Sequence, residues 1–370
     1  MSQISHPGSF IASEITDVIR NNAAEAEKLV RLHDKQLEVI YRENWFNLFV
    51  PKFFGGLELS LPEALRVEEA LAWADGSMGW TVTLCSGANW FIGFLDSDAA
   101  KEIFLNPKVC LAGSGKVSAI AKITGNGYEI SGLWKYASGA PHATVFTVNC
   151  VIERDGLFLK DDFGNSLVNS FWFWRSEVII HEDWNCMGMT ATASHSFEVK
   201  QIQVPKNRAF VIDSATAVLN HPVYKFPFLQ FAETTLAVNM SGMATCFLDL
   251  AEKLLQEKMQ QNDEGIKNIE AINEKIGKAG MRLNAARKLF YTTVEKAWSE
   301  LLLTDDINEA LLNELSKVCH HLAKNAREIV DALYPYCGLI AASHDSEINR
   351  VWRNLHTASQ HSLLSSFNEE

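Results

Sequence analysis

Two short segments, far apart in the chain, contain the residues best suited to chemistry. In the first, residues 132–143, Trp134 is followed by Ser138, a serine set among small residues and next to Gly139. A flat indole suits packing beside a large planar ring, and a hydroxyl next to glycine can approach a ligand closely. From these residues alone, the simpler interpretation is that Trp134 belongs to a core and Ser138 to a turn.

The second segment lies near the C-terminus and ends at His361. Arg350 and Arg353 share a helix face, and His361 follows Arg353 by roughly two turns if the helix continues. An imidazole beside a ring-shaped substrate can act as a base near neutral pH, although a solitary histidine is more often a surface or capping residue. No Ser-His-Asp order or paired-carboxylate spacing is evident elsewhere, which disfavours a hydrolase.

Composition narrows the class of protein. The formal net charge of −12 over 370 residues disfavours nonspecific binding to nucleic acid or anionic lipid. No run approaches the ~18 apolar residues of a membrane span, and residues 1–9 lack the pattern of a secretory signal. The seven cysteines are dispersed and form no CxxC pair, and the adjacent His320 and His321 project to different sides of a helix. We therefore expect a cytoplasmic protein with reduced thiols, no metal site, and neither a membrane nor a nucleic acid as partner.

The helix and strand patterns along the sequence predict three domains, which would position these two segments. Residues 1–106 read as an N-terminal helical domain, in which Ser60 and Glu63 can cap a helix. Residues 107–210 are rich in strand patterns, among them a hairpin across residues 125–127 and a strand over residues 171–180. Their close spacing predicts a small barrel or sandwich rather than βαβ units.

Residues 211–370 read as a C-terminal helical bundle. Apolar residues recur at helical spacing over residues 276–301 and 307–330, and no proline occurs between Pro227 and Pro335. Residues 262–265 and 304–306 fit the short turns between antiparallel helices. The expected fold class is mainly α with a β middle domain.

These segments, in this order, resemble the acyl-CoA dehydrogenase superfamily along nearly the whole chain. Residues 50–80, from VPKFFGG to ADGSMGW, resemble its N-terminal helical signature. Residues 181–194, HEDWNCMGMTATAS, followed by Val204-Pro205, resemble its D-x-W…G-M-x-x-T-x-S…V-P passage. The resemblance implies a helical N-terminal domain, a middle β-barrel and a C-terminal four-helix bundle.

Residues 134–139, WKYASG, are more similar to the W-x-F-x-S-G form of the flavin-dependent monooxygenase branch. That branch takes reduced flavin, FAD or FMN, from a separate reductase and hydroxylates aromatic or related substrates through a flavin hydroperoxide. The resemblance implies that Trp134 flanks the flavin ring and that Ser138 contacts the flavin or its oxygen adduct. It places Leu111 and Ser114 on a strand beside the ring, and His361 near the substrate.

Departures from the family pattern keep two alternatives open. Where dehydrogenases often have a catalytic Glu in a Y-E-G-T motif, residues 360–363 read QHSL, and the R-x-x-F-G element is missing near residues 257–260. An FAD-dependent acyl-CoA dehydrogenase would need another base, and Glu295 or Glu314 could serve only if the fold pointed one inward. Ala88 precedes Asn89-Trp90 where some monooxygenases have His, and Arg353-Asn354 replaces an Arg-Asp pair. A non-catalytic flavin-binding relative is therefore the second alternative.

Partners follow mainly from the resemblance. It implies a flavin reductase that supplies the reduced cofactor, and a homotetramer assembled through the helical bundles. The sequence is compatible with assembly, because Phe226, Phe228, Phe231 and Met240 provide apolar surface to cover at the start of the bundle. The aromatic run at residues 171–174 hints at an apolar pocket, but use in a buried core is the simpler interpretation.

Overall fold

Helices form the first part of the chain. The computed structural model describes residues 4–260 and 269–365. The N-terminal helices are α1 (Ser13–Leu29), α2 (Asp34–Arg42), α3 (Leu61–Ala74), α4 (Gly76–Asn89) and α5 (Ser97–Phe104). The predicted cap of α3 is confirmed, because the Ser60 backbone N–H and hydroxyl both donate to Glu63 Oε2, at 2.9 and 2.6 Å.

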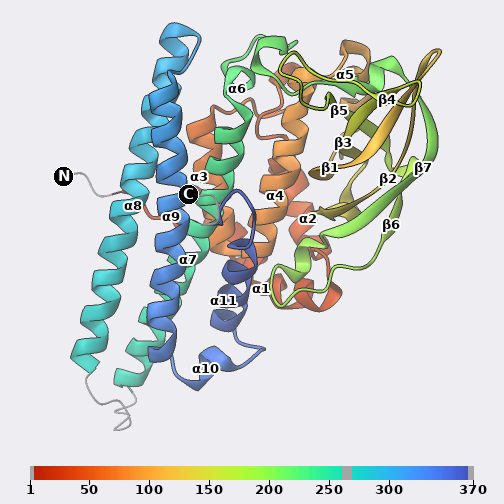
Figure 1. The fold of residues 1–370 in the computed structure, drawn as a ribbon. Helices are drawn as coiled ribbons and strands as arrows, with labels where there is room; N and C mark the ends of the chain where they lie inside the picture. Colours follow the sequence, from red (N-terminus) through yellow and green to blue (C-terminus); the bar gives the residue numbers. More distant parts are fainter. Residues whose placement is uncertain (1–3, 261–268, 366–370) are drawn as a thin grey trace.

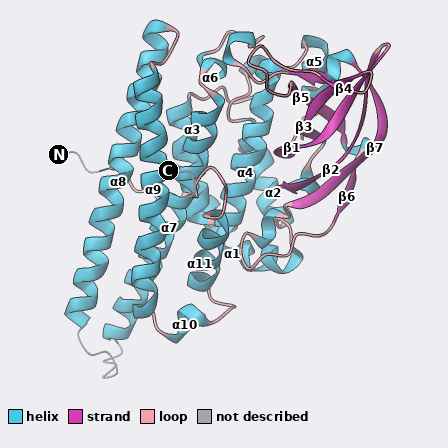
Figure 2. Cartoon of the chain, viewed as in Figure 1, coloured by secondary structure: helices cyan, strands magenta, loops and turns pink. Residues whose placement is uncertain are grey.

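The middle of the chain forms one curved sheet of eight strands in the described residues (Figure 2). The strands are β1 (Leu111–Thr124), β2 (Gly127–Ala137), β3 (Val145–Arg154), β4 (Leu157–Phe158), β5 (Val168–Trp174), β6 (Ile179–His181), β7 (His195–Pro205) and β8 (Ala209–Phe210). Their order is β6-β7-β2-β1-β3-β5-β8, with β4 paired to β3. The predicted hairpin is confirmed, since Thr124 of β1 lies opposite Gly127 of β2.

The strand predicted over residues 171–180 is wrong in one respect. β5 ends at Trp174, and a turn at Arg175–Glu177 separates it from β6, which pairs with β7 at the other end of the sheet order. The Glu177 carboxylate accepts the Trp174 backbone N–H at 2.7 Å. A side-chain acceptor therefore closes the turn at the end of β5.

The C-terminal part is again helical. Its helices are α6 (Pro222–Lys225), α7 (Phe228–Gln260), α8 (Ile269–Thr304), α9 (Glu309–Leu333), α10 (Leu339–Ala342) and α11 (Glu347–Ala358). The turn predicted at residues 304–306 joins α8 to α9 as expected, whereas the one predicted at residues 262–265 lies outside the described residues. The domain boundaries at 106/107 and 210/211 stay predictions. None of the described helices has the length and apolarity needed to span a bilayer.

Helix α4 lies between the bundle and the sheet (Figure 1). It contacts β1 and the turn at Thr190–Thr192 on the sheet side, and α7 and α11 on the bundle side. Separate hydrophobic cores fill the helical part and the inside of the sheet domain. Helix α4 therefore positions the residues on both sides of any site formed between the sheet and the bundle.

A buried ion pair joins α3 to α8. The Arg287 guanidinium donates to both carboxylate oxygens of Glu69, at 2.8 and 2.9 Å, and Tyr291 Oη donates to the same carboxylate at 2.9 Å. Both charged side chains are almost fully buried. The bidentate geometry and the added hydroxyl satisfy groups that would otherwise be costly to remove from water.

Candidate functional site

The turn after β2 is packed directly on α4. Gly139 has φ +77°, and a Cβ at this position would lie 2.7 Å from Cys85 Sγ on α4. Glycine is therefore required both for the left-handed backbone and for the close approach. The Gly139 N–H donates to the Thr192 carbonyl at 2.8 Å, and Cys85 Sγ donates to the Ser138 carbonyl at 3.6 Å. These contacts fix the position of Ser138.

Three buried hydroxyls form a chain that begins at Ser138. Ser138 Oγ lies 2.8 Å from Ser194 Oγ, Ser194 Oγ lies 2.7 Å from Thr192 Oγ1, and Thr192 Oγ1 donates to the Met189 carbonyl at 2.7 Å. A carbonyl can only accept, and each hydroxyl has one proton. The Thr192 hydroxyl therefore donates to the Met189 carbonyl, the Ser194 hydroxyl donates to Thr192 Oγ1, and the Ser138 hydroxyl donates to Ser194 Oγ. The Ser138 oxygen is left with lone pairs only, so it can accept a hydrogen bond from a ligand but cannot donate one.

Backbone strain gathers around this chain of hydroxyls. Tyr136, Met189 and Ala193 all have left-handed φ angles, of 69°, 54° and 44°. Such angles are uncommon for residues other than glycine and persist only where surrounding contacts enforce them. At Met189 these contacts are the hydrogen bonds that its carbonyl accepts from Thr192 Oγ1, at 2.7 Å, and from Trp184 Nε1, at 2.9 Å.

His361 lies on the other flank of α4. Its ring packs edge-on against Trp80, with ring centroids 5.9 Å apart, and Trp80 directly precedes Thr81, which lines the space around Gly139. Burial lowers the pKa of His361 below its usual value because the charged form loses hydration. Nδ1 accepts the Leu363 backbone N–H at 3.3 Å, so the proton of the neutral ring is on Nε2. In this state the ring offers a donor at Nε2 rather than a base.

The structure does not bring Trp134 to the same place. Trp134 is fully buried inside the sheet domain, where it stacks on Phe197 with centroids 5.5 Å apart, and its Nε1 donates to the Asn149 carbonyl at 3.4 Å. This is the core position that was the simpler alternative for this residue. Its ring has no free face for a flavin here, and the ring-flanking role stays a prediction without support from its packing.

The two weaker candidates on β1 differ from each other. Leu111 is fully buried in the helical core, and its backbone N–H donates to Asn89 Oδ1 at 2.8 Å. Ser114 is partly exposed, and its hydroxyl accepts only a long 3.4 Å bond from the Lys116 N–H among the described contacts. Of the two, Ser114 has a side chain free to meet a ligand.

Tyr136 is an exposed aromatic residue beside the candidate site that the sequence did not reveal. It lies two residues before Ser138, 68% of its surface is exposed, and its ring meets the edge of the Trp184 ring at 6.2 Å. The register of β2 against β7 shifts between Trp134 and Ala137, which separates the orientation of Tyr136 from the alternation that buries Trp134. The only signal in the sequence was the aromatic residue at the third position of WKYASG, Tyr136. Its outward orientation depends on the bulge in β2, which the sequence pattern does not show.

A cavity of about 390 Å³ lies elsewhere, lined by Arg66, Lys288, Tyr291 and neighbouring residues. Of the residues considered for the site, only Glu295, the possible dehydrogenase base, lines it, and Trp134, Ser138, Leu111, Ser114 and His361 do not. The candidate site is defined by Ser138 and His361, which lie against Cys85 and Trp80 of α4, and by Tyr136, which meets Trp184 in the loop before β7.

Comparisons with known proteins agree with this architecture. Residues 234–366 match the model of the acyl-CoA dehydrogenase C-terminal domain family. The crystal structure of the HsaA monooxygenase from M. tuberculosis superposes with a TM-score of 0.86 and 24% identity, covering 95% of this chain and 91% of that chain. The chain has an acyl-CoA dehydrogenase-like fold.

Homologues at the sequence level are monooxygenases. Indole-3-acetate monooxygenase of Pseudomonas putida is 26% identical over 97% of this chain and 92% of that protein. The oxygenase subunit HsaA of a Mycobacterium tuberculosis flavin-dependent monooxygenase is 25% identical, over 93% of this chain and 88% of the subunit. The predicted fold class and the predicted resemblance, closest to the flavin-dependent monooxygenase branch, are confirmed.

The two carboxylates considered as an alternative dehydrogenase base lie at the surface. Glu295 and Glu314 form surface ion pairs with Arg66 and Lys296, and their side chains are 58% and 50% exposed. Neither points inward, so the structure gives a dehydrogenase no base from these two residues.

Asn89, which follows the departure at Ala88, is structural. Its Nδ2 donates to Asn47 Oδ1 at 2.8 Å while its Oδ1 holds the start of β1. Ala88 is buried and brings no functional group. Asn354 also keeps the essential property of an aspartate, because its Oδ1 accepts the Met189 N–H at 2.6 Å. A lapse of function does not follow from these substitutions.

Proposed function

We propose that this chain is the oxygenase component of a two-component flavin-dependent monooxygenase that hydroxylates an aromatic or other apolar small molecule. The proposal is supported by nearly full-length similarity to oxygenases of this class. The observation on this chain that carries it is the acceptor-only hydroxyl of Ser138, held in place two residues after an exposed aromatic ring.

The residues present fit a reduced flavin. Bound at the site, reduced FAD or FMN would supply two electrons, so that O₂ and two protons convert a substrate C–H to C–OH and release water. Reduced flavin carries an N–H on its central ring that oxidised flavin lacks, and an acceptor at Ser138 favours the form with the donor. Tyr136 and Trp184 would provide flat apolar contact, with Ser114 as a further polar contact.

We propose that His361 binds the substrate. Its Nε2–H can donate to a hydroxyl, phenolate or carboxylate oxygen, and its lowered pKa keeps the ring neutral at physiological pH. Its contact with Trp80 holds the ring against α4.

A separate flavin reductase, using a nicotinamide nucleotide, would deliver the reduced flavin. The chain would be a cytoplasmic homotetramer, which is supported by the buried free thiols and by exposed apolar side chains on the bundle, among them Leu303, Leu339 and Met281. The apolar surface expected at the start of the bundle was mostly wrong: Phe226, Phe231 and Met240 are buried in the core, and only Phe228 is exposed.

The test begins with anaerobic titration of the purified chain with FAD and FMN in both redox states. We expect tighter binding of a reduced flavin than of its oxidised form. Turnover with a flavin reductase, NADH and ¹⁸O₂ against a panel of indoles and phenols should give a product that contains one ¹⁸O atom. Failure to bind either reduced flavin, or oxygen consumption that yields only hydrogen peroxide with every compound, would overturn the proposal. Bleaching of bound FAD by a saturated acyl-CoA would favour the dehydrogenase instead.

A further inference from the structure

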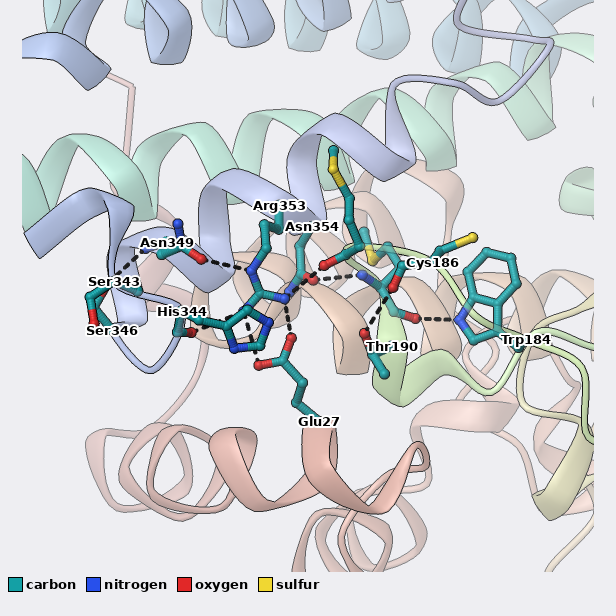
Figure 3. Close-up of polar contacts among 12 residues, drawn as sticks. Glu27, Trp184, Cys186, Thr190, Ser343, His344, Ser346, Asn349, Arg353 and Asn354 are labelled. Carbon is teal, nitrogen blue, oxygen red and sulfur yellow. Dashed lines mark hydrogen bonds and ion pairs between the residues drawn. The ribbon is translucent and has the colours of Figure 1, made fainter.

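The loop that ends the hydroxyl chain is fastened to α11 (Figure 3). Asn354 Oδ1 accepts the Met189 N–H at 2.6 Å. At Gly188 a Cβ would lie 2.1 Å from the Arg353 carbonyl oxygen, so the loop backbone rests directly on the helix. A side chain of any other residue at position 188 would push the loop away from α11.

Arg353 anchors the same loop to a second helix. Its Nη1 donates to the Met187 carbonyl at 2.7 Å, and its guanidinium pairs with Glu27 of α1, one contact being 3.0 Å from Nη2 to Oε2. Its Nε donates to Asn349 Oδ1 at 2.7 Å. Because Arg353 is buried and bonded through all three nitrogens, the loop, α1 and α11 are tied at one point (Figure 3).

Met189 links this anchor to the candidate site. Its N–H is held by Asn354, while its carbonyl accepts from both Thr192 Oγ1 at 2.7 Å and Trp184 Nε1 at 2.9 Å. The carbonyl is the terminal acceptor that sets the direction of every hydroxyl proton back to Ser138. The same carbonyl holds the Trp184 ring, which meets Tyr136.

We infer that Arg353 and Asn354 are positioning residues that fix the direction of the hydroxyl chain and so make Ser138 an acceptor for reduced flavin. The inference rests on the proposed function. If the Met189 peptide moves, Thr192 loses its carbonyl acceptor and can donate to Ser194 instead. The chain then reverses, Ser138 becomes able to donate outward, and its selectivity for a flavin N–H is lost.

The experiment compares Asn354→Leu with Asn354→Asp, which keeps the acceptor oxygen. The matched control is Asn325→Leu, because Asn325 is also buried in the C-terminal helices but bonds Arg282 and His321, away from the loop. For each full-length variant, the dissociation constants of oxidised and reduced FAD and FMN are measured anaerobically, together with the thermal midpoint and the peroxide formed per NADH.

We expect Asn354→Leu to lower the preference for reduced flavin by about tenfold, as for loss of one favourable hydrogen bond, and to raise peroxide release. Asn354→Asp should restore the preference for reduced flavin. Asn325→Leu should lower the thermal midpoint but leave the preference for reduced flavin unchanged. Equal loss of preference in Asn325→Leu and Asn354→Leu, or an unchanged preference in Asn354→Leu, would overturn the inference. A wild-type chain that binds no reduced flavin would overturn the proposed function itself.

Discussion

Substitution of Ser194 by alanine tests the polarity of the hydroxyl chain most directly. Ser194 lies in the middle, accepting from Ser138 and donating to Thr192. Alanine removes both bonds but leaves the Thr192 bond to the Met189 carbonyl in place. Ser138 then keeps its position on α4 through its backbone and loses only the acceptor for its proton.

The magnitude follows from the burial of all three hydroxyls. Loss of two neutral hydrogen bonds at about 1 kcal/mol each should lower the free energy of unfolding by about 2 kcal/mol. With no acceptor inside the protein, the Ser138 proton turns towards the ligand, where it competes with the N–H of reduced flavin. An unfavourable donor-to-donor contact in place of a bond should reduce the preference for reduced over oxidised flavin by about tenfold, or roughly 1.4 kcal/mol.

The assay is anaerobic titration followed by absorbance and fluorescence, with urea unfolding on the same samples. Ser170→Ala is the matched control, because Ser170 is 6% exposed against 5% for Ser194, lies in the same sheet domain and donates to Asn149 Oδ1 at 2.7 Å. We expect Ser170→Ala, which loses one hydrogen bond, to cost about 1 kcal/mol against about 2 kcal/mol for Ser194→Ala, and the flavin preference to change only in Ser194→Ala. A Ser194→Ala protein with an unchanged preference would refute the assigned direction of the hydroxyl protons.

Two further predictions concern stability. Arg287→Met leaves the Glu69 carboxylate buried without its cation, so urea unfolding at pH 7 should show a loss of about 3–5 kcal/mol, and a loss under 1 kcal/mol would contradict the burial of this pair. Burial lowers the pKa of His142 from about 6.5 to about 4 in the folded chain. As the pH falls below about 6.5, the unfolded chain therefore binds a proton at His142, whereas the folded chain binds it only near pH 4. Stability should therefore be fully present above pH 6.5 and fall by up to roughly 3 kcal/mol as pH drops to 4, and His142→Asn should flatten this dependence in unfolding curves measured between pH 7 and 4.5.

Local signals in the sequence were sufficient where the structure depends on near neighbours. The cap of α3 by Ser60 and Glu63, the hairpin between β1 and β2 and the turn at residues 304–306 each depend on a few adjacent residues. The division of residues 171–180 was missed, because a turn closed by Glu177 interrupts an apolar run that reads as one strand.

The candidate site could be predicted only in part from the sequence. Ser138 and His361 were found through the resemblance of their segments to a known family, and α4 places them on its two flanks. Trp134 lies in the core, which was the simpler interpretation of this residue, whereas one bulge in β2 turns Tyr136, for which no environment was predicted, outward. Periodicity cannot report a bulge, since it shifts the register without changing the composition.

The order of helical and strand-rich parts, the glycine beside Ser138 and the chemical types at the site can all be predicted from residue identity and short-range spacing. The role of Ser138 as an acceptor cannot, because it follows from contacts between distant segments. That property depends on the Met189 carbonyl, fixed by Asn354 of α11, and on one proton per hydroxyl along Thr192 and Ser194. The direction of a series of hydrogen bonds is set by its terminal acceptor. Here that acceptor is the carbonyl of Met189, and the residue that holds Met189 in place, Asn354, is 165 residues away in the sequence.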